Sequence, residues 1–64
     1  MKRLKVHEVI KILEKDGWYM VNQKGSHRQY KHPTKKGRVT VNSKLSDTLE
    51  QFVLSNIFKQ AGLK

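Results

Sequence analysis

The chain has 64 residues, and its 14 Lys and Arg against five Asp and Glu give a formal net charge of +9 at pH 7. This length supports one small domain with a modest core, which we expect to span residues 1–64. The absence of cysteine excludes disulfides, thiolate nucleophiles and cysteine metal ligands. No apolar run approaches the roughly 20 residues of a membrane span, so we expect no membrane association and a cytoplasmic location.

The first element is predicted to be a helix over residues 4–16. Val6, Val9, Ile10 and Leu13 follow the spacing of one buried helical face, and Gly17 supplies the stop. Residues 18–23 are rich in aromatic and β-favouring types, which predicts a strand.

Two further strands are predicted over residues 26–32 and 38–42, separated by a turn over residues 33–37. A two-residue turn at Lys24-Gly25 would precede them, because glycine accepts the positive φ that hairpins need. This turn would place Asn22 opposite His27 and Tyr19 opposite Tyr30. The register of the third strand stays open.

The last element is predicted to be an amphipathic helix that ends at Gly62. Asp47 and Glu50 have the spacing of a capping box at its start. The apolar residues that would share its buried face are Leu49, Phe52, Val53, Ile57 and Ala61.

This order predicts an α+β fold, α-β-β-β-α, with a three-stranded antiparallel sheet. Such a sheet cannot bury a face alone, so two helices are expected on one face, leaving the other open to solvent. The residues expected to be largely buried are Val9, Ile10, Leu13, Val39, Val41, Phe52, Val53 and Ile57.

The basic residues form an uncompensated block, because residues 17–46 contain no carboxylate. A positive surface of this kind suits a phosphate backbone, and we expect RNA or another nucleic acid as the partner. An acidic protein partner and simple solubility are the alternatives.

His27 is the candidate catalytic residue within this block. Histidine exchanges a proton near neutral pH, and RNA carries its own nucleophile, the 2′-hydroxyl. The candidate RNA-binding groups are the cations Lys24, Arg28 and Lys31 and the backbone amides of Gly25 and Ser26. The alternative is an ordinary surface histidine on a strand.

Other residues are assigned structural roles. Trp18 and Tyr19 can stack on bases, but their position after Gly17 favours core packing. His32 precedes Pro33 and is expected to act locally. No histidines have the spacing and carboxylate company of a metal site, so neither a metal nor a small-molecule cofactor is expected.

The segment "GWYMVNQKGSHRQYKHPTKKGRVTV", preceded by "EVIKILEKD" and followed by "IFKQAGL", resembles the HicA family of toxins from toxin–antitoxin systems. The resemblance covers about residues 5–63. The most specific parts are the Gly25-Ser26-His27 element and the terminal "KQAGL".

The resemblance implies a fold like that of double-stranded-RNA-binding domains and a type II toxin that cleaves messenger RNA without a metal, using His27. It also implies a HicB antitoxin partner. The chain reads Asn42-Ser43-Lys44 where many members have a proline and a histidine, which removes a candidate second acid or base. The chain also reads Phe52-Val53 where members often have Gly-Thr opening the last helix, so this helix begins either at Asp47, by its cap, or several residues later. A non-catalytic RNA-binding module of the same fold is the alternative function.

Overall fold

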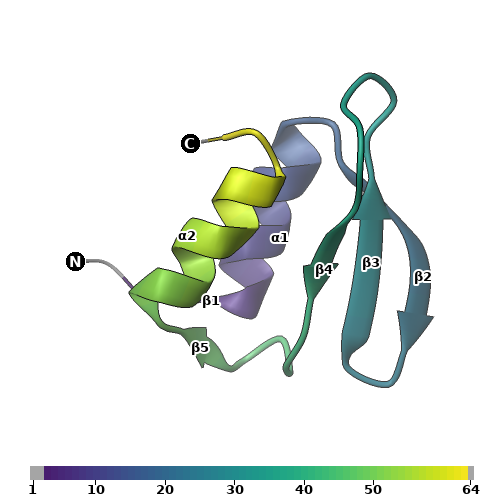
Figure 1. Cartoon of the computed structure of the whole chain (residues 1–64). Coiled ribbons are helices and arrows are strands. Elements are labelled where there is room, and N and C mark those ends of the chain that lie inside the picture. Colours follow the sequence, from purple (N-terminus) through teal and green to yellow (C-terminus); the bar gives the residue numbers. More distant parts are fainter. Residues whose placement is uncertain (1–2, 64) are drawn as a thin grey trace.

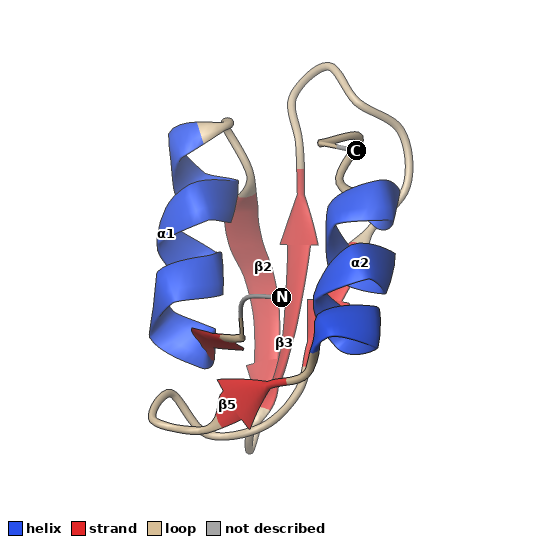
Figure 2. Ribbon diagram, turned by 90° about the vertical axis from the view of Figure 1, so that its left-hand side faces the viewer, coloured by secondary structure: helices blue, strands red, loops and turns tan. Residues whose placement is uncertain are grey.

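The computed structural model describes residues 3–63, and its elements follow the predicted α-β-β-β-α order with one additional pair of short strands (Figure 1). The elements are β1 (Leu4–Lys5), α1 (Val6–Lys15), β2 (Tyr19–Lys24), β3 (His27–Lys31), β4 (Val39–Val41), β5 (Thr48–Leu49) and α2 (Gln51–Gln60). Both helices lie on one face of the antiparallel β2-β3-β4 sheet, which confirms the predicted α+β fold (Figure 2). Neither helix within residues 3–63 has the length and apolar content that crossing a bilayer requires.

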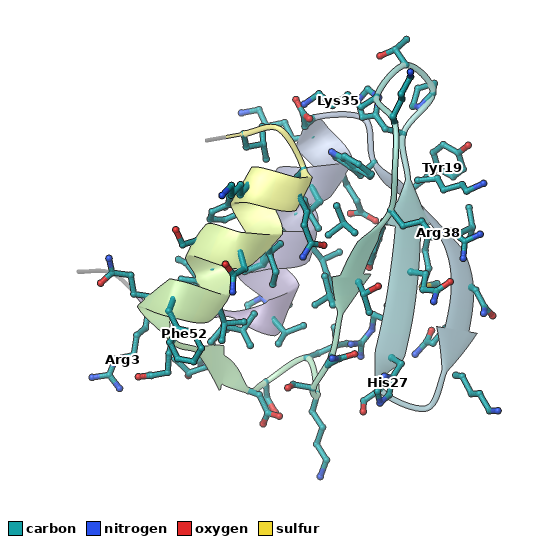
Figure 3. All side chains as sticks on the ribbon, viewed as in Figure 1. Arg3, Tyr19, His27, Lys35, Arg38 and Phe52 are labelled. Atoms are coloured by element: carbon teal, nitrogen blue, oxygen red, sulfur yellow. The ribbon has the colours of Figure 1, made fainter. Side chains whose placement is uncertain are left out.

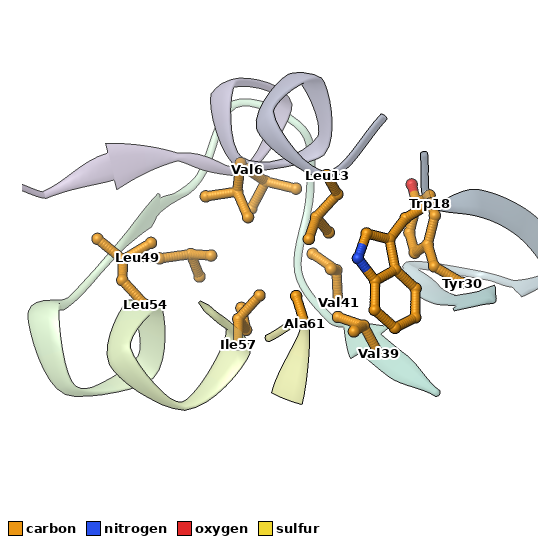
Figure 4. Packing of buried hydrophobic residues seen from close by; sticks show 11 residues of the cluster. Val6, Leu13, Trp18, Tyr30, Val39, Val41, Leu49, Leu54, Ile57 and Ala61 are labelled. Atoms are coloured by element: carbon orange, nitrogen blue, oxygen red, sulfur yellow. The ribbon is translucent and has the colours of Figure 1, made fainter. Parts of the chain in front are cut away.

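The core lies between the helices and the sheet (Figure 4). Five of the residues predicted to be buried lie in this core: Val9, Leu13, Val39, Val41 and Ile57. Ile10 and Val53 are only partly buried at its margin. The remaining buried apolar residues are Val6, Trp18, Tyr30, Leu49, Leu54 and Ala61.

The prediction for Phe52 is wrong, because its side chain is 70% exposed. The face of α2 that meets the core carries Ile57, as predicted, together with Leu54, which the prediction did not include. Phe52 lies on the solvent side of the first helical turn (Figure 3).

The last helix begins at Gln51, later than its predicted cap at Asp47. The Asp47 carboxylate instead accepts the backbone N–H of Lys44, 3.0 Å away, and so closes a turn. The Asp47 carbonyl accepts the N–H of Val6 at 2.9 Å, one of the donors that a helix start leaves without a partner. Residues 45–49 therefore cap α1 and pair with β1, which keeps them out of α2.

The predicted hairpin register is also wrong. The two-residue turn is Gly25-Ser26, so Lys24 pairs with His27. Gly25 has φ +59°, and a positive φ at the first central position is typical of a type II′ turn. An irregularity between Met20 and Asn22 then shifts the ladder by one residue.

Candidate RNA-binding face

The central strand β3 presents its side chains alternately to the helices and to solvent. Arg28 and Tyr30 are buried on the helix side, whereas His27 and Lys31 are exposed and Gln29 is half-buried on the opposite side. Tyr30 pairs with Val39 in β4, which settles the register that the sequence left open and places both in the core. We call the solvent side of the β2-β3-β4 sheet the open face.

Cross-strand pairing assembles the first part of the site on the open face. Lys24 lies opposite His27, and Asn22 lies opposite Gln29. These four residues line one shallow hollow. Directly paired side chains on the same face of a sheet are close neighbours, so the imidazole of His27 and the ammonium of Lys24 can reach the same ligand.

The His27 ring is exposed, and within residues 3–63 it makes no hydrogen bond or ion pair. Both of its ring nitrogens are therefore open to a ligand. No carboxylate lies in residues 17–46, so no acidic side chain of the sheet competes for Lys24 or repels a phosphate. An exposed imidazole beside an ammonium can transfer a proton next to a stabilised negative charge.

The turn before His27 carries the two predicted backbone ligands, Gly25 and Ser26. Gly25 is exposed at the tip, where an added Cβ would meet nothing within 4 Å, so a ligand can approach its backbone. Its carbonyl accepts the Gln23 side-chain amide at 3.2 Å. Ser26 is half-buried, and its carbonyl points to the other side of the hairpin, where it accepts Arg28.

Arg28 lies away from the other predicted cations, on the helix side of the sheet, and is only 8% exposed. Its Nη1 donates to the carbonyls of Ser26 at 3.2 Å and Ser43 at 2.8 Å. Ser43 has φ +84°, a strained left-handed conformation for a residue other than glycine. Arg28 therefore ties the Gly25-Ser26 turn, which precedes His27, to the segment that follows β4.

The far end of the open face contains Lys31, which pairs with Tyr19 in β2. Arg38 precedes β4, and its Nη1 donates to Oε1 of Gln29 at 3.0 Å. Sequence reasoning did not select Asn22, Gln29 or Arg38. The alternation of β3 alone could have indicated Gln29, because it lies two residues from His27.

His32 has the local role that its position predicted. The N–H groups of Thr34 and Lys35 donate to Nδ1 at 3.1 and 3.2 Å, and Nε2 lies 2.7 Å from the Asp16 carbonyl oxygen. This arrangement requires a neutral ring with its proton on Nε2. The ring also meets Trp18 edge-on, with centroids 5.2 Å apart.

Lys35 joins the same cluster, since its ammonium donates to the Asp16 carboxylate and to the Ala61 carbonyl, 2.9 Å away. The hydrogen bond from Lys35 lowers the pKa of Asp16. This cluster links the end of α1, the β3–β4 loop and the end of α2, and is separate from the open face.

A second hollow lies over the start of α2, lined by Glu50, Gln51, Phe52, Ser55 and Asn56. Its lining contains no basic side chain, and its one carboxylate, Glu50, lies 3.7 Å from Nη1 of Arg3, so this hollow lacks the uncompensated positive charge of the open face. Within residues 3–63, no three His, Asp or Glu side chains come together as a group that could hold a metal ion.

The family model described as the HicA toxin of bacterial toxin–antitoxin systems matches residues 6–63, nearly the whole chain. No curated protein matches the chain.

Proposed function

This chain belongs to the HicA family, the toxins of bacterial toxin–antitoxin systems, and from that premise we propose that it is a metal-independent endoribonuclease that cleaves messenger RNA. The observation that carries the proposal is the position of His27. Its unengaged imidazole lies opposite Lys24 on a sheet face without carboxylates.

In the proposed reaction, the ribose 2′-hydroxyl attacks the adjacent phosphorus. The P–O5′ bond breaks, which leaves a 2′,3′-cyclic phosphate and a 5′-hydroxyl. His27 either accepts the proton of the 2′-hydroxyl or donates a proton to the leaving 5′-oxygen, and solvent water carries out the other proton transfer. Lys24 and the amides of the Gly25-Ser26 turn stabilise the charge that develops on the phosphoryl oxygens.

The other predicted cations have different roles in this proposal. Lys31 binds a phosphate at the other end of β3. Arg28 is a positioning residue, because its guanidinium is buried and already donates to two carbonyls. It acts on RNA through the turn that it holds.

A second candidate function is RNA binding without cleavage. This function is favoured because His27 is the only histidine on the open face within residues 3–63. His32 is held at the end of α1 by the Asp16 carbonyl, and His7 lies on α1. A single imidazole must then serve the reaction without a partner acid or base.

Membership of the family implies pairing with an antitoxin. We further propose that the antitoxin is of the HicB type and that it covers the open face with acidic groups that replace phosphates at Lys24 and Lys31. Because the proposed substrate is messenger RNA, we also propose that the protein acts in the cytoplasm.

Induced expression in bacterial cells tests the proposed activity. The parent chain should arrest growth, and His27→Ala at equal abundance should not, because general acid–base catalysis contributes about 10²–10⁴-fold. His7→Ala is the matched control, since it removes an exposed histidine from α1. If His27→Ala arrests growth as the parent does, RNA binding without cleavage becomes the better description.

The products of the purified protein test the chemistry. Cleavage should continue in EDTA, and the fragments should carry 2′,3′-cyclic phosphates and 5′-hydroxyls. Fragments with 5′-phosphates, or cleavage that EDTA abolishes, would contradict the metal-independent reaction.

A further inference from the structure

Tyr19 was predicted to pack in the core, but its side chain is 49% exposed. Its neighbour Trp18 is the aromatic residue that the core uses, at 2% exposed. Tyr19 pairs with Lys31, whose β3 neighbour Tyr30 is buried on the helix side. The aromatic ring of Tyr19 is therefore on the open face, together with His27.

Two cations share the open face with this aromatic ring. Lys31 lies directly opposite Tyr19, and Arg38 donates to Gln29, two residues before Lys31. Because Arg38 occupies Oε1 of Gln29, the Gln29 side-chain NH₂ group remains as a donor for a ligand. The far end of the open face therefore combines an aromatic surface, two positive charges and a hydrogen-bond donor.

The separation from His27 fits a short run of nucleotides. Lys31 is four residues along β3 from His27, which is about 13 Å at the usual rise of a strand. Sheets that bind single-stranded RNA stack two or three bases on exposed aromatic residues. A base in a duplex could not reach Tyr19 in this way, because both of its faces are already stacked.

We infer that Tyr19, with Lys31, Arg38 and Gln29, forms a base-stacking subsite that holds an unpaired nucleotide of the RNA strand whose backbone passes His27. This inference rests on the proposed function, since it names the form of RNA that the same face accepts. The subsite selects single-stranded over double-stranded RNA.

The test measures binding of an unstructured single-stranded oligoribonucleotide that is 2′-O-methylated throughout and cannot be cleaved. Tyr19→Ala should weaken binding about tenfold, within the range measured for base–aromatic stacking. Tyr19→Phe should bind as the parent does, because it keeps the ring. Met20→Ala is the matched control, since Met20 is 47% exposed but pairs with Tyr30 on the other side of β2.

Oligonucleotides with a single abasic site locate the stacked base without changing the protein. One abasic position should weaken binding to the parent about as much as Tyr19→Ala does, and the two changes together should cost no more than either alone. Unchanged binding by Tyr19→Ala, equal loss in Met20→Ala, or equal affinity for a duplex would overturn the inference. Because the probe cannot react, these results are independent of whether the parent cleaves RNA.

Discussion

Adjacent residues in β3 have opposite roles. His27 is exposed on the open face, whereas Arg28 is buried and bonded to two backbone carbonyls. The side-chain period of a strand, two residues, produces this division. A basic residue type in the sequence therefore does not by itself identify a side chain that binds phosphate. Lys24 and Arg28 are both cations, but only the Lys24 side chain is available to bind a phosphate.

Arg28→Ala should destabilise the fold. It removes charged hydrogen bonds to the Ser26 and Ser43 carbonyls, which are worth about 1.5–3 kcal/mol. Lys24→Ala should change the free energy of unfolding by less than about 0.5 kcal/mol, because Lys24 is exposed. Denaturant unfolding of both variants checks the contrast, and equal stabilities would show that Arg28 does not tie the two loops together.

At the scale of elements, α2 packs Ile57 against the core and leaves Phe52 exposed. Ile57→Ala should cost about 2–5 kcal/mol, because Ile57 is buried in the core. Phe52→Ala should stay within about 0.5 kcal/mol. Thermal or denaturant unfolding separates the two, and a large loss in Phe52→Ala would be inconsistent with its exposed position.

The hydrogen bond from Lys35 to the Asp16 carboxylate, at the end of α1, should make the free energy of unfolding depend on pH. Lys35 lowers the pKa of Asp16 below its ordinary value of 3.8. The Asp16 carboxyl therefore binds its proton more tightly in the unfolded chain than in the folded one. The stabilisation of the folded state by ionised Asp16 is present above pH 3.8 and is lost as the pH falls through the lowered pKa of the folded state. Lys35→Met should flatten this part of the pH–stability curve, measured by denaturant midpoints from neutral pH to about pH 3. A curve parallel to that of the parent would exclude the interaction as a source of acid sensitivity.

The sequence predicts those elements whose signal is local. The spacing of Val9 and Leu13 indicates α1, and alternation in residues 39–41 indicates β4. The start of α2 is different, since Asp47 has a capping pattern but its carbonyl is used by Val6, forty-one residues away in the chain. Such a tertiary contact leaves no local pattern.

The residue types of the candidate site were predictable from the sequence, but the sheet face that each residue occupies was not. The Gly25-Ser26-His27 element and Lys24 are recognisable from residue type, and the fold brings Lys24 and His27 together. Arg28 and Tyr19 lie on opposite faces of the sheet, and which face each occupies depends on the hairpin register. That register follows from the turn at Gly25-Ser26 and the irregularity after Met20, neither of which the sequence specified.

At the scale of the whole molecule, the positive charge is divided between faces. The open face contributes Lys24, Lys31 and Arg38, and engagement of three phosphates on a single strand predicts a log–log salt slope of about −2. Lys31→Ala should reduce the slope by about 0.7, whereas Lys11→Ala should leave it unchanged, because Lys11 lies on α1. Binding titrations at several salt concentrations measure both slopes, and an equal effect of Lys11→Ala would mean that total charge matters more than the open face.

The most direct test of the central claim is the rate at which purified His27→Ala cleaves RNA, measured with enzyme in excess. The rate should fall about 10²–10⁴-fold, while the melting temperature stays the same and RNA affinity changes little, because His27 is exposed and the open-face cations remain. Cleavage by His27→Ala at the rate of the parent would contradict the assignment of His27 as the catalytic residue.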